Sequence, residues 1–234
     1  ESVLEFLKND MEVNVKVRHS EDKIKRITSY LCEIFEKLGG LNEDKKWLLS
    51  QLSCLPPGFH TFKKLEELIK IEGNREIALR KNLKSLSYKG WIQYEPKTES
   101  FKLHRIIIEV INKTIPLDLE ILKPLISKII SNLPVEWTKK NPTEKFKWIP
   151  YGKAILNQFK TEKYSAAIVK LQNNLALVLQ DLGGNENLQD AKKWLEKAKD
   201  SAEENFEEKH PTTAVSYSNL ALVLQDLGGN ENLQ

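Results

Sequence analysis

Apolar residues recur every three or four positions along most of the chain, which is the spacing of one face of an α-helix. The first such stretch covers residues 20–39, and the next two cover Asn42–Leu55 and Thr61–Ile71. A fourth runs from Arg75 to Tyr88. Residues that end helices close these stretches, namely Gly40, Pro56, Gly73 and Gly90. The pattern predicts a mainly α protein.

Two short runs after the fourth helix have the composition of β-strands. They are Trp91–Tyr94 and Ser100–Leu103, and the turn-rich segment Glu95–Glu99 separates them. Three helices followed by a small β-hairpin is the order of a winged helix. We therefore predict a winged-helix domain over residues 41–115, and a family resemblance of Leu103-His104-Arg105 implies that residues 1–40 are the end of a helical subdomain.

The C-terminal part contains an internal repeat. Asn174–Gln189 recurs letter for letter as Asn219–Gln234, an offset of 45 residues. In the first copy, apolar residues at helical spacing precede Gly183-Gly184, which we expect to end the helix. A second helix is expected from about Leu188 to Phe206. Identical letters predict the same fold for both copies. The apolar residues of the first helix are Leu171, Leu175, Val178, Leu179 and Leu182.

Small residues stand where the two helices of a unit approach, at Ala176, Ala191 and Ala198. With the Asn174-Leu-Ala opening, they resemble the signature of the tetratricopeptide repeat, most of all its kinesin-light-chain-like variety. The segment Gly184–Asn187 departs from that pattern and is interpreted as an insertion that lengthens the hairpin. The resemblance implies an α-α superhelix over residues 165–234, with a protein or peptide partner on the repeat surface. Because one such unit cannot cover its own apolar face, we expect further repeats in a longer natural protein.

Residues 116–164 lie between these two regions. The apolar helix expected over Leu119–Leu133 is followed by Trp137, Phe146 and Trp148 in a proline-punctuated stretch. We predict a helical adaptor that covers the first repeat. The alternative is that the aromatic side chains form a recognition patch.

The charge pattern adds a second alternative. The 234 residues carry a net charge of only +3, but residues 71–105 hold eight basic and four acidic side chains. The last helix of a winged helix fits the major groove of DNA, so a transcription regulator is the alternative function. The excess is small compared with the phosphate contacts of a firm DNA complex, so nucleic acid is not the favoured partner. The basic residues in question are Arg75, Arg80, Lys81, Lys84, Lys89, Lys97 and Lys102.

Leu103-His104-Arg105, at the end of the second strand, resembles the Met-His-Asp element of NB-ARC proteins, which are nucleotide-switch ATPases of the STAND class. The resemblance implies that His104 binds the β-phosphate of ADP, which a separate nucleotide-binding subdomain holds. Arg105 stands where the family has Asp and reverses the charge, so the role of that Asp does not carry over. The alternative for His104 is a half-buried histidine at a strand end.

No chemistry of catalysis or metal binding is apparent in the sequence. Gly152-Lys153 lacks a glycine five positions earlier and is followed by Ala154, so it is not a phosphate-binding loop. Cys32, Cys54 and the four histidines show no ligand spacing. We therefore expect no enzyme, no metal and no cofactor within these residues, with ADP or ATP bound only alongside the absent subdomain.

Two cysteines, and the lack of any apolar run of roughly 20 residues, favour a cytoplasmic protein without a membrane segment. The chain begins with Glu1 and has its only methionine at position 11, so we expect it to be part of a longer protein. The function predicted is that of a non-catalytic regulatory and protein-interaction segment of a STAND-type signalling or defence ATPase.

Overall fold

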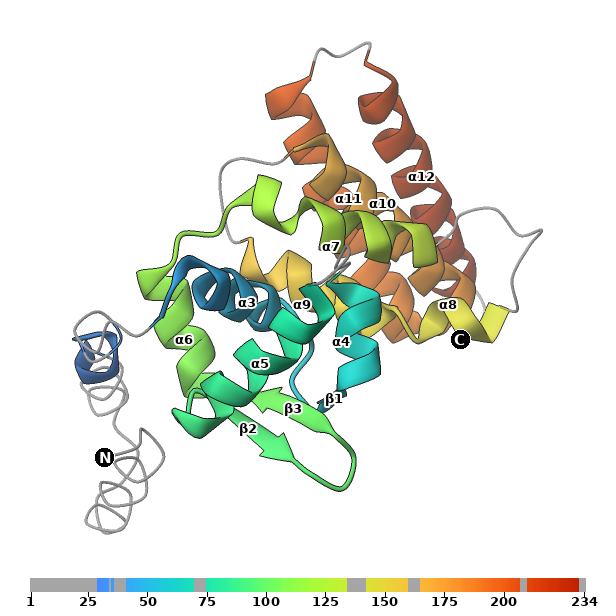
Figure 1. Cartoon of the computed structure of the whole chain (residues 1–234). Helices are drawn as coiled ribbons and strands as arrows, with labels where there is room; N and C mark the ends of the chain where they lie inside the picture. The colour runs from blue at the N-terminus through green and yellow to red at the C-terminus, as the bar shows by residue number, and fades with distance from the viewer. Residues whose placement is uncertain are drawn as a thin grey trace, which may run out of the picture. The chain divides into compact units, whose positions relative to one another are not determined.

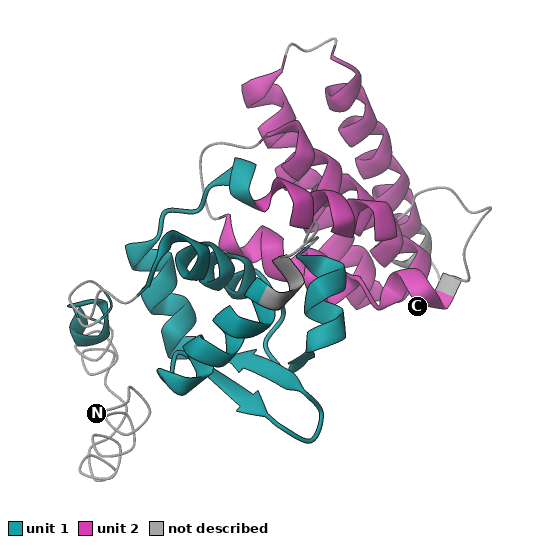
Figure 2. Ribbon diagram, in the orientation of Figure 1, with its two compact units in different colours: residues 1–121 teal, residues 122–234 magenta. Residues whose placement is uncertain are grey.

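The computed structural model describes residues 29–33, 35, 41–69, 75–133, 142–159, 165–206 and 210–231. The chain divides into two compact units, residues 1–121 and residues 122–234 (Figure 2). Helices predominate in both, as the sequence predicted (Figure 1). The helix expected over residues 20–39 falls largely outside the described residues, although 29–33 and 35 are helical.

From residue 41 onward, the described part of unit 1 combines four helices with a small antiparallel sheet. In chain order the elements are α3 (Glu43–Ser53), β1 (His60–Thr61), α4 (Phe62–Leu68), α5 (Arg75–Tyr88), β2 (Ile92–Glu95), β3 (Ser100–Leu103) and α6 (Arg105–Thr114). The strands lie in the order β1-β3-β2, with Tyr94 opposite Phe101 in the β2–β3 pair. The predicted helices and hairpin are confirmed. Strand β1 was not predicted, because two residues give no alternating pattern.

The sequence explains why these helices begin where they do. The Asn42 side chain accepts a hydrogen bond from the Lys45 amide at 3.2 Å, which caps α3. Thr61 caps α4 in the same way, through the Lys64 amide at 3.2 Å. Leucines at helical spacing in α3, α4 and α5 are buried and form the core with residues of β2 and α6. They are Leu48, Leu49, Leu65, Leu68, Leu83 and Leu86, joined by Ile92, Ile107 and Ile111.

All the elements in the described part of unit 2 are helices. Its elements are α7 (Leu119–Asn132, which begins just before the division), α8 (Pro142–Phe146), α9 (Ile149–Gln158), α10 (Ala166–Leu182), α11 (Asn185–Asn205) and α12 (Pro211–Glu231). Helix α10 contacts α8 and α9 on one side and α11 and α12 on the other. Helix α11 also contacts α12, so the last three helices form a packed group (Figure 1).

The link between α10 and α11 is shorter than expected. Helix α11 begins at Asn185, so Gly183 and Gly184 alone turn the chain. Their φ angles of 72° and 83° lie in the left-handed region that favours glycine. Asn187 donates to the Gly183 carbonyl at 2.7 Å and belongs to the first turn of α11. The interpretation of Gly184–Asn187 as an insertion was wrong.

The two identical blocks fold alike only in their first part. Asn174–Leu182 and Asn219–Leu227 are both helical, but α12 continues through Gly228 to Glu231 where α10 ends at Leu182. The expectation of one fold for both copies is corrected here. Local sequence cannot cause the difference, since the letters are the same. The packing does differ: α11 lies against α10, and no described helix lies on the corresponding face of α12. Leu182, one of the apolar residues at helical spacing in the first copy, is 43% exposed.

Helices α8 and α9 are tied to the first repeat unit by polar contacts. Lys145 pairs with Asp181 of α10, and Lys153 pairs with Asp190 of α11. Asn174 donates to the Leu133 carbonyl, at the end of α7, at 3.0 Å. Gly152 of α9 lies so close to α10 that an added Cβ would meet Leu175 at 3.3 Å. These contacts place α8 and α9 against the first repeat unit, and the helical adaptor over residues 116–164 stays a prediction.

Among the described helices, none is both long enough and apolar enough to cross a bilayer.

Candidate protein-interaction surface

Helix α12 exposes four large apolar side chains. Val215, Tyr217, Leu222 and Leu224 are between 44% and 50% exposed. The helix is also poor in charge, because Asp226 is the sole charged residue between Pro211 and Gly228. An apolar face of this kind on one element is typical of a binding or packing surface.

The exposed residues of α12 fall on two different faces. Val215, Ser218 and Leu222 follow one another at helical spacing and define what we call the open stripe. The second face, which we call the outer seam, alternates steps of three and four residues. It consists of Ala214, Tyr217, Ala221, Leu224 and Gly228, all exposed.

The first copy of the repeat separates the roles of these two faces. The residues of α10 that correspond to the outer seam are packed away, with Ala176 and Leu179 at 0% exposure. Val169, which corresponds to Ala214, clusters with Ala198 and Ala202 of α11. The open stripe differs only in part. Its α10 counterparts Lys170 and Leu177 are exposed and half-buried, whereas Asn173, the counterpart of Ser218, is buried and bonded to Ser216 of α12. Val215 and Leu222 are therefore the members of the open stripe whose positions are not fully buried in either copy.

A hydrogen-bond network fixes α10 against α12. Asn173 donates to the Ser216 hydroxyl at 2.9 Å, and Asn219 donates to Asn173 Oδ1 at 2.9 Å. Near the other end of α10, Gln180 donates to Asp226 at 2.6 Å. Because Asn173 and Ser216 are buried, leaving either one unpartnered would cost free energy. The network fixes the position of α12 along α10. Exposed residues of α10 and exposed residues of α12 therefore lie on neighbouring helices.

His104 lies at the junction of β3 and α6. It is exposed, and its carbonyl accepts hydrogen bonds from the amides of Ile107 and Ile108 at 2.9 and 3.1 Å. Its side chain makes no capping hydrogen bond to α6. The alternative of a half-buried histidine is wrong. The neighbouring Arg105 is almost fully exposed and pairs with Glu109 at 3.8 Å. The contact of His104 with nucleotide stays a prediction.

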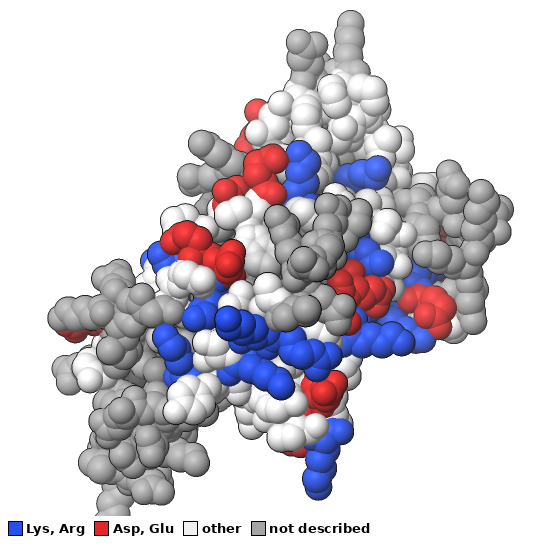
Figure 3. All heavy atoms as spheres, viewed as in Figure 1, with Lys and Arg blue, Asp and Glu red and all other residues white. Residues whose placement is uncertain are grey.

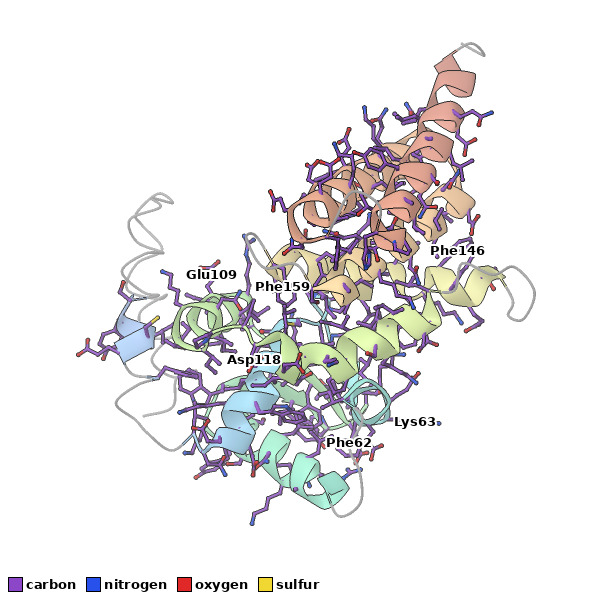
Figure 4. All side chains as sticks on the ribbon, turned by 90° about the horizontal axis from the view of Figure 1, so that it is seen from above. Phe62, Lys63, Glu109, Asp118, Phe146 and Phe159 are labelled. Atoms are coloured by element: carbon purple, nitrogen blue, oxygen red, sulfur yellow. The ribbon has the colours of Figure 1, made fainter. Side chains whose placement is uncertain are left out.

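Basic side chains gather over α4 and α5 (Figure 3). Lys81 and Lys84 of α5 and Lys63 of α4 are exposed, and Lys63 projects outward from its helix (Figure 4). Arg80 has a structural role instead. Its guanidinium lies 3.9 Å from the Phe62 ring centroid and pairs with Glu99 at 3.3 Å. The Arg75 side chain lies outside the described residues.

Two further features of unit 1 were considered as sites of chemistry. Burial raises the pKa of the Cys54 thiol to about 12, which keeps it protonated and unreactive. A hollow of about 480 Å³ lies beside α3 and α6, lined by Phe35, Trp47, Ile115 and Ile121 among others. The charged residues on its wall, Glu43 and Lys46, pair with each other at 2.9 Å. Within the described part of the chain, no three potential metal ligands come together.

The sequence did contain a signal for the exposed apolar faces of α12 that was not used: one change falls in the open stripe and one in the outer seam. At the 45-residue offset, Val215 stands where the first copy has Lys170, and Tyr217 stands where it has Gln172. Both changes make the second copy more apolar, although Val215 and Tyr217 are exposed there. Exposure itself cannot be derived from the letters, because Leu179 and Leu224 are the same residue in the same local sequence.

Comparison with known proteins gives a match for the C-terminal helices only. A family model described as tetratricopeptide repeat matches residues 167–231, which span α10, α11 and α12. No curated protein and no solved structure matches the chain. Residues 167–231 are therefore a tetratricopeptide-repeat region, a type of scaffold that binds protein partners.

Proposed function

We propose that the chain is a non-catalytic regulatory segment, in which the repeat region recognises a protein or peptide and residues 41–115 form a winged helix that transmits the event. The observation that carries this proposal is the open stripe. Val215 and Leu222 present exposed apolar surface on α12, at positions that are exposed or half-buried in the first copy. A partner peptide with apolar side chains at matching positions would bury that surface.

The arrangement of unit 1 supports a winged helix. Its order of helix, short strand, two helices and hairpin, with β1 added beside β3, gives α5 an exposed face and leaves the β2–β3 turn as a wing. In the STAND context that we propose, this module has no chemistry of its own. It would change position when a partner binds to the repeats, as domains do in two-state switches.

His104 is proposed to contact ADP held by a nucleotide-binding subdomain outside these residues. Its exposure supports this role, because an imidazole N–H can donate to phosphate oxygen only if it reaches beyond its own domain. The test uses a longer protein that carries such a subdomain. The His104→Ala change should speed ADP release at least about tenfold, whereas Arg105→Ala should leave it within about twofold, since tenfold corresponds to the loss of one good hydrogen bond. Equal release rates for His104→Ala and the parent would reject the assignment.

The partner-binding surface is tested on the chain itself. Peptides are selected from a random display library for binding to the parent chain, and their affinity is then measured for Leu222→Lys and Tyr88→Lys. Both residues are exposed, but Tyr88 lies in α5, outside the repeat region. We expect Leu222→Lys to weaken binding at least about tenfold, as for a residue at an interface centre, and Tyr88→Lys to have no effect. Equal affinity for both variants would contradict the proposed surface.

The alternative is DNA binding through α5. Lys81 and Lys84 favour it, whereas the contacts of Arg80 with Phe62 and Glu99 argue against it. A salt titration with duplex DNA separates the two functions, because five neutralised phosphates would give a slope of about −4.5 in log K against log salt. Absence of binding at low salt would reject this alternative.

A further inference from the structure

We propose that the neighbouring helices α10 and α12 select a peptide by the order of its charges, with an acidic residue near Lys170 and a basic residue near Asp226. Apolar side chains of the peptide lie between these two charges. This selection rests on the proposed function, in which a peptide binds at the open stripe. It adds the chemistry of that peptide and the direction in which it lies.

The exposed apolar residues of the open stripe share one side of α12 with residues that bond to α10. Asn219 donates to Asn173 at 2.9 Å, and Asp226 accepts a hydrogen bond from Gln180 at 2.6 Å. Val215 and Leu222 lie three or four positions from these two residues, so all four lie on the side of α12 that flanks α10. We call this set the α12 row. It consists of Val215, Asn219, Leu222 and Asp226.

Helix α10 has a corresponding row, and the two rows run in the same direction. Asn173 and Gln180 of α10 bond to successively later residues of α12, so the two neighbouring helices are parallel (Figure 1). The bonded residues are 43 to 46 positions apart, close to the offset of the repeat. Corresponding residues of the two rows therefore lie at similar levels. The α10 row consists of Lys170, Asn174, Leu177 and Asp181.

The N-terminal end of the two rows carries one positive charge. Lys170 is exposed, and Val215, at the corresponding position of α12, is 50% exposed and uncharged. The other three positions hold the same residues in both rows. Lys170 makes no ion pair with any residue that the structure describes. An acidic group of a peptide can therefore pair with Lys170 without displacing another carboxylate.

The opposite end of the two rows carries one unpaired negative charge. Asp181 of α10 is paired with the buried Lys145 of α8. Asp226 of α12 is exposed, and the Gln180 amide that bonds to it is neutral. Among the described residues, no cation pairs with Asp226. A basic group of a peptide therefore finds its partner in Asp226.

Apolar side chains lie between the two charges. Leu222 is 49% exposed, and Leu177 at the corresponding position is half-buried. Asp181, which is level with Asp226, follows Lys170 by eleven positions. Eleven positions span about 16 Å of helix, which an extended peptide covers in about five residues. A peptide with the opposite order of charges would place like charges together at both ends, which weakens binding.

The test exchanges the two charges and leaves the net charge of the chain unchanged. One double variant combines Lys170→Glu with Asp226→Lys, and the control combines Lys193→Glu with Glu204→Lys on α11. All four side chains are exposed, and the Gln180 amide can turn its oxygen toward an ammonium group, so both variants should fold. Peptides are selected from a random display library on the parent chain. Their affinities for all three chains are measured, and circular dichroism checks that the chains are folded.

The selected peptides should bind the charge-exchanged chain at least about tenfold more weakly than the parent, and the control chain within about twofold. Exchanging the acidic and basic residues of a peptide should restore its affinity for the charge-exchanged chain to within about threefold of the original value. Equal affinity for the parent and the charge-exchanged chain would overturn the proposal. So would a peptide whose exchanged form does not recover.

Leu222→Lys separates this failure from failure of the proposed function. Loss of binding in Leu222→Lys, with none in the charge-exchanged chain, would mean that a peptide binds at the open stripe but is not selected by charge. Unchanged binding in both would reject the proposed surface as well. Self-association of the parent that the charge exchange abolishes, measured by sedimentation velocity, would also overturn the proposal, because the occupant would then be a second copy.

Discussion

Helices α10 and α12 share an identical segment, Asn174–Leu182 in the first and Asn219–Leu227 in the second, in different surroundings. Leu179 of α10 is fully buried, whereas Leu224, its counterpart in α12, is 44% exposed. The chain turns at Gly183 in the first copy and remains helical at Gly228 in the second. The comparison teaches that Gly-Gly permits a helix end but does not impose one. Packing of the following helix decides whether the turn forms.

The energies involved are consistent with this interpretation. Glycine inside a helix costs only about 1 kcal/mol relative to alanine, so α12 can continue through Gly228. Burial of a leucine contributes about 1.5–3 kcal/mol, and α11 buries several side chains against α10. Where a helix is available to pack, as in the first copy, the turn is the more stable outcome.

Replacing the corresponding leucine in each copy should give the largest difference in the free energy of unfolding. Leu179→Ala should lower the free energy of unfolding by about 2–5 kcal/mol, because it leaves a cavity between α10 and α11. Leu224→Ala should cost less than about 1 kcal/mol, since its side chain is already half in solvent. Urea unfolding of both variants measures the difference. Equal losses would show that the outer seam is covered in solution.

The matched aspartates test the contacts to the adaptor. Asp181 pairs with the buried Lys145, while Asp226 accepts a hydrogen bond from Gln180 at the surface. Asp181→Asn should cost about 2 kcal/mol, because it removes the carboxylate that faces a buried ammonium group. Asp226→Asn should cost about 0.5 kcal/mol or less. Guanidinium unfolding at matched salt compares them, and a larger loss for Asp226→Asn would contradict the account of how α8 is held.

The matched asparagines, Asn174 and Asn219, should give a smaller difference in the free energy of unfolding. Asn174 is buried and donates to the Leu133 carbonyl, whereas Asn219 is less buried and donates to Asn173. Asn174→Ala should cost about 1–3 kcal/mol, because the carbonyl at the end of α7 loses its donor. Asn219→Ala should cost about 1 kcal/mol. The check is the midpoint of urea unfolding, and the order of the two losses is the result that matters.

The smallest expected effect is a pH dependence of the stability of unit 1, which contains His60. Burial lowers the pKa of His60 below its ordinary value of 6.5, while its Nε2 donates to the Pro56 carbonyl at 2.9 Å. Below pH 6.5 the unfolded chain therefore binds a proton at this histidine before the folded chain does. The free energy of unfolding of unit 1 should fall as pH falls from 6.5 through the folded-state pKa. His60→Gln should flatten that decline, and an unchanged slope would contradict the assignment.

Much of the fold could be predicted because its signals are local. Helix α5 and strand β3 were placed correctly, since leucine spacing marks the one and apolar residues bounded by turns mark the other. Strand β1 was missed because pairing with β3, and not its two residues, makes it a strand. The open stripe was missed for a related reason, because exposure of Leu222 depends on which neighbours are present. His104 was singled out by resemblance, and its exposure became known only from the fold.

Residue-specific amide hydrogen exchange, measured by NMR, tests most directly whether burial by α11 is what separates the two copies. The amides of Leu175–Leu179 should exchange at least about tenfold more slowly than those of Leu220–Leu224, because Ala176 and Leu179 are buried whereas their counterparts Ala221 and Leu224 are exposed. Equal protection of the two identical segments would contradict this explanation.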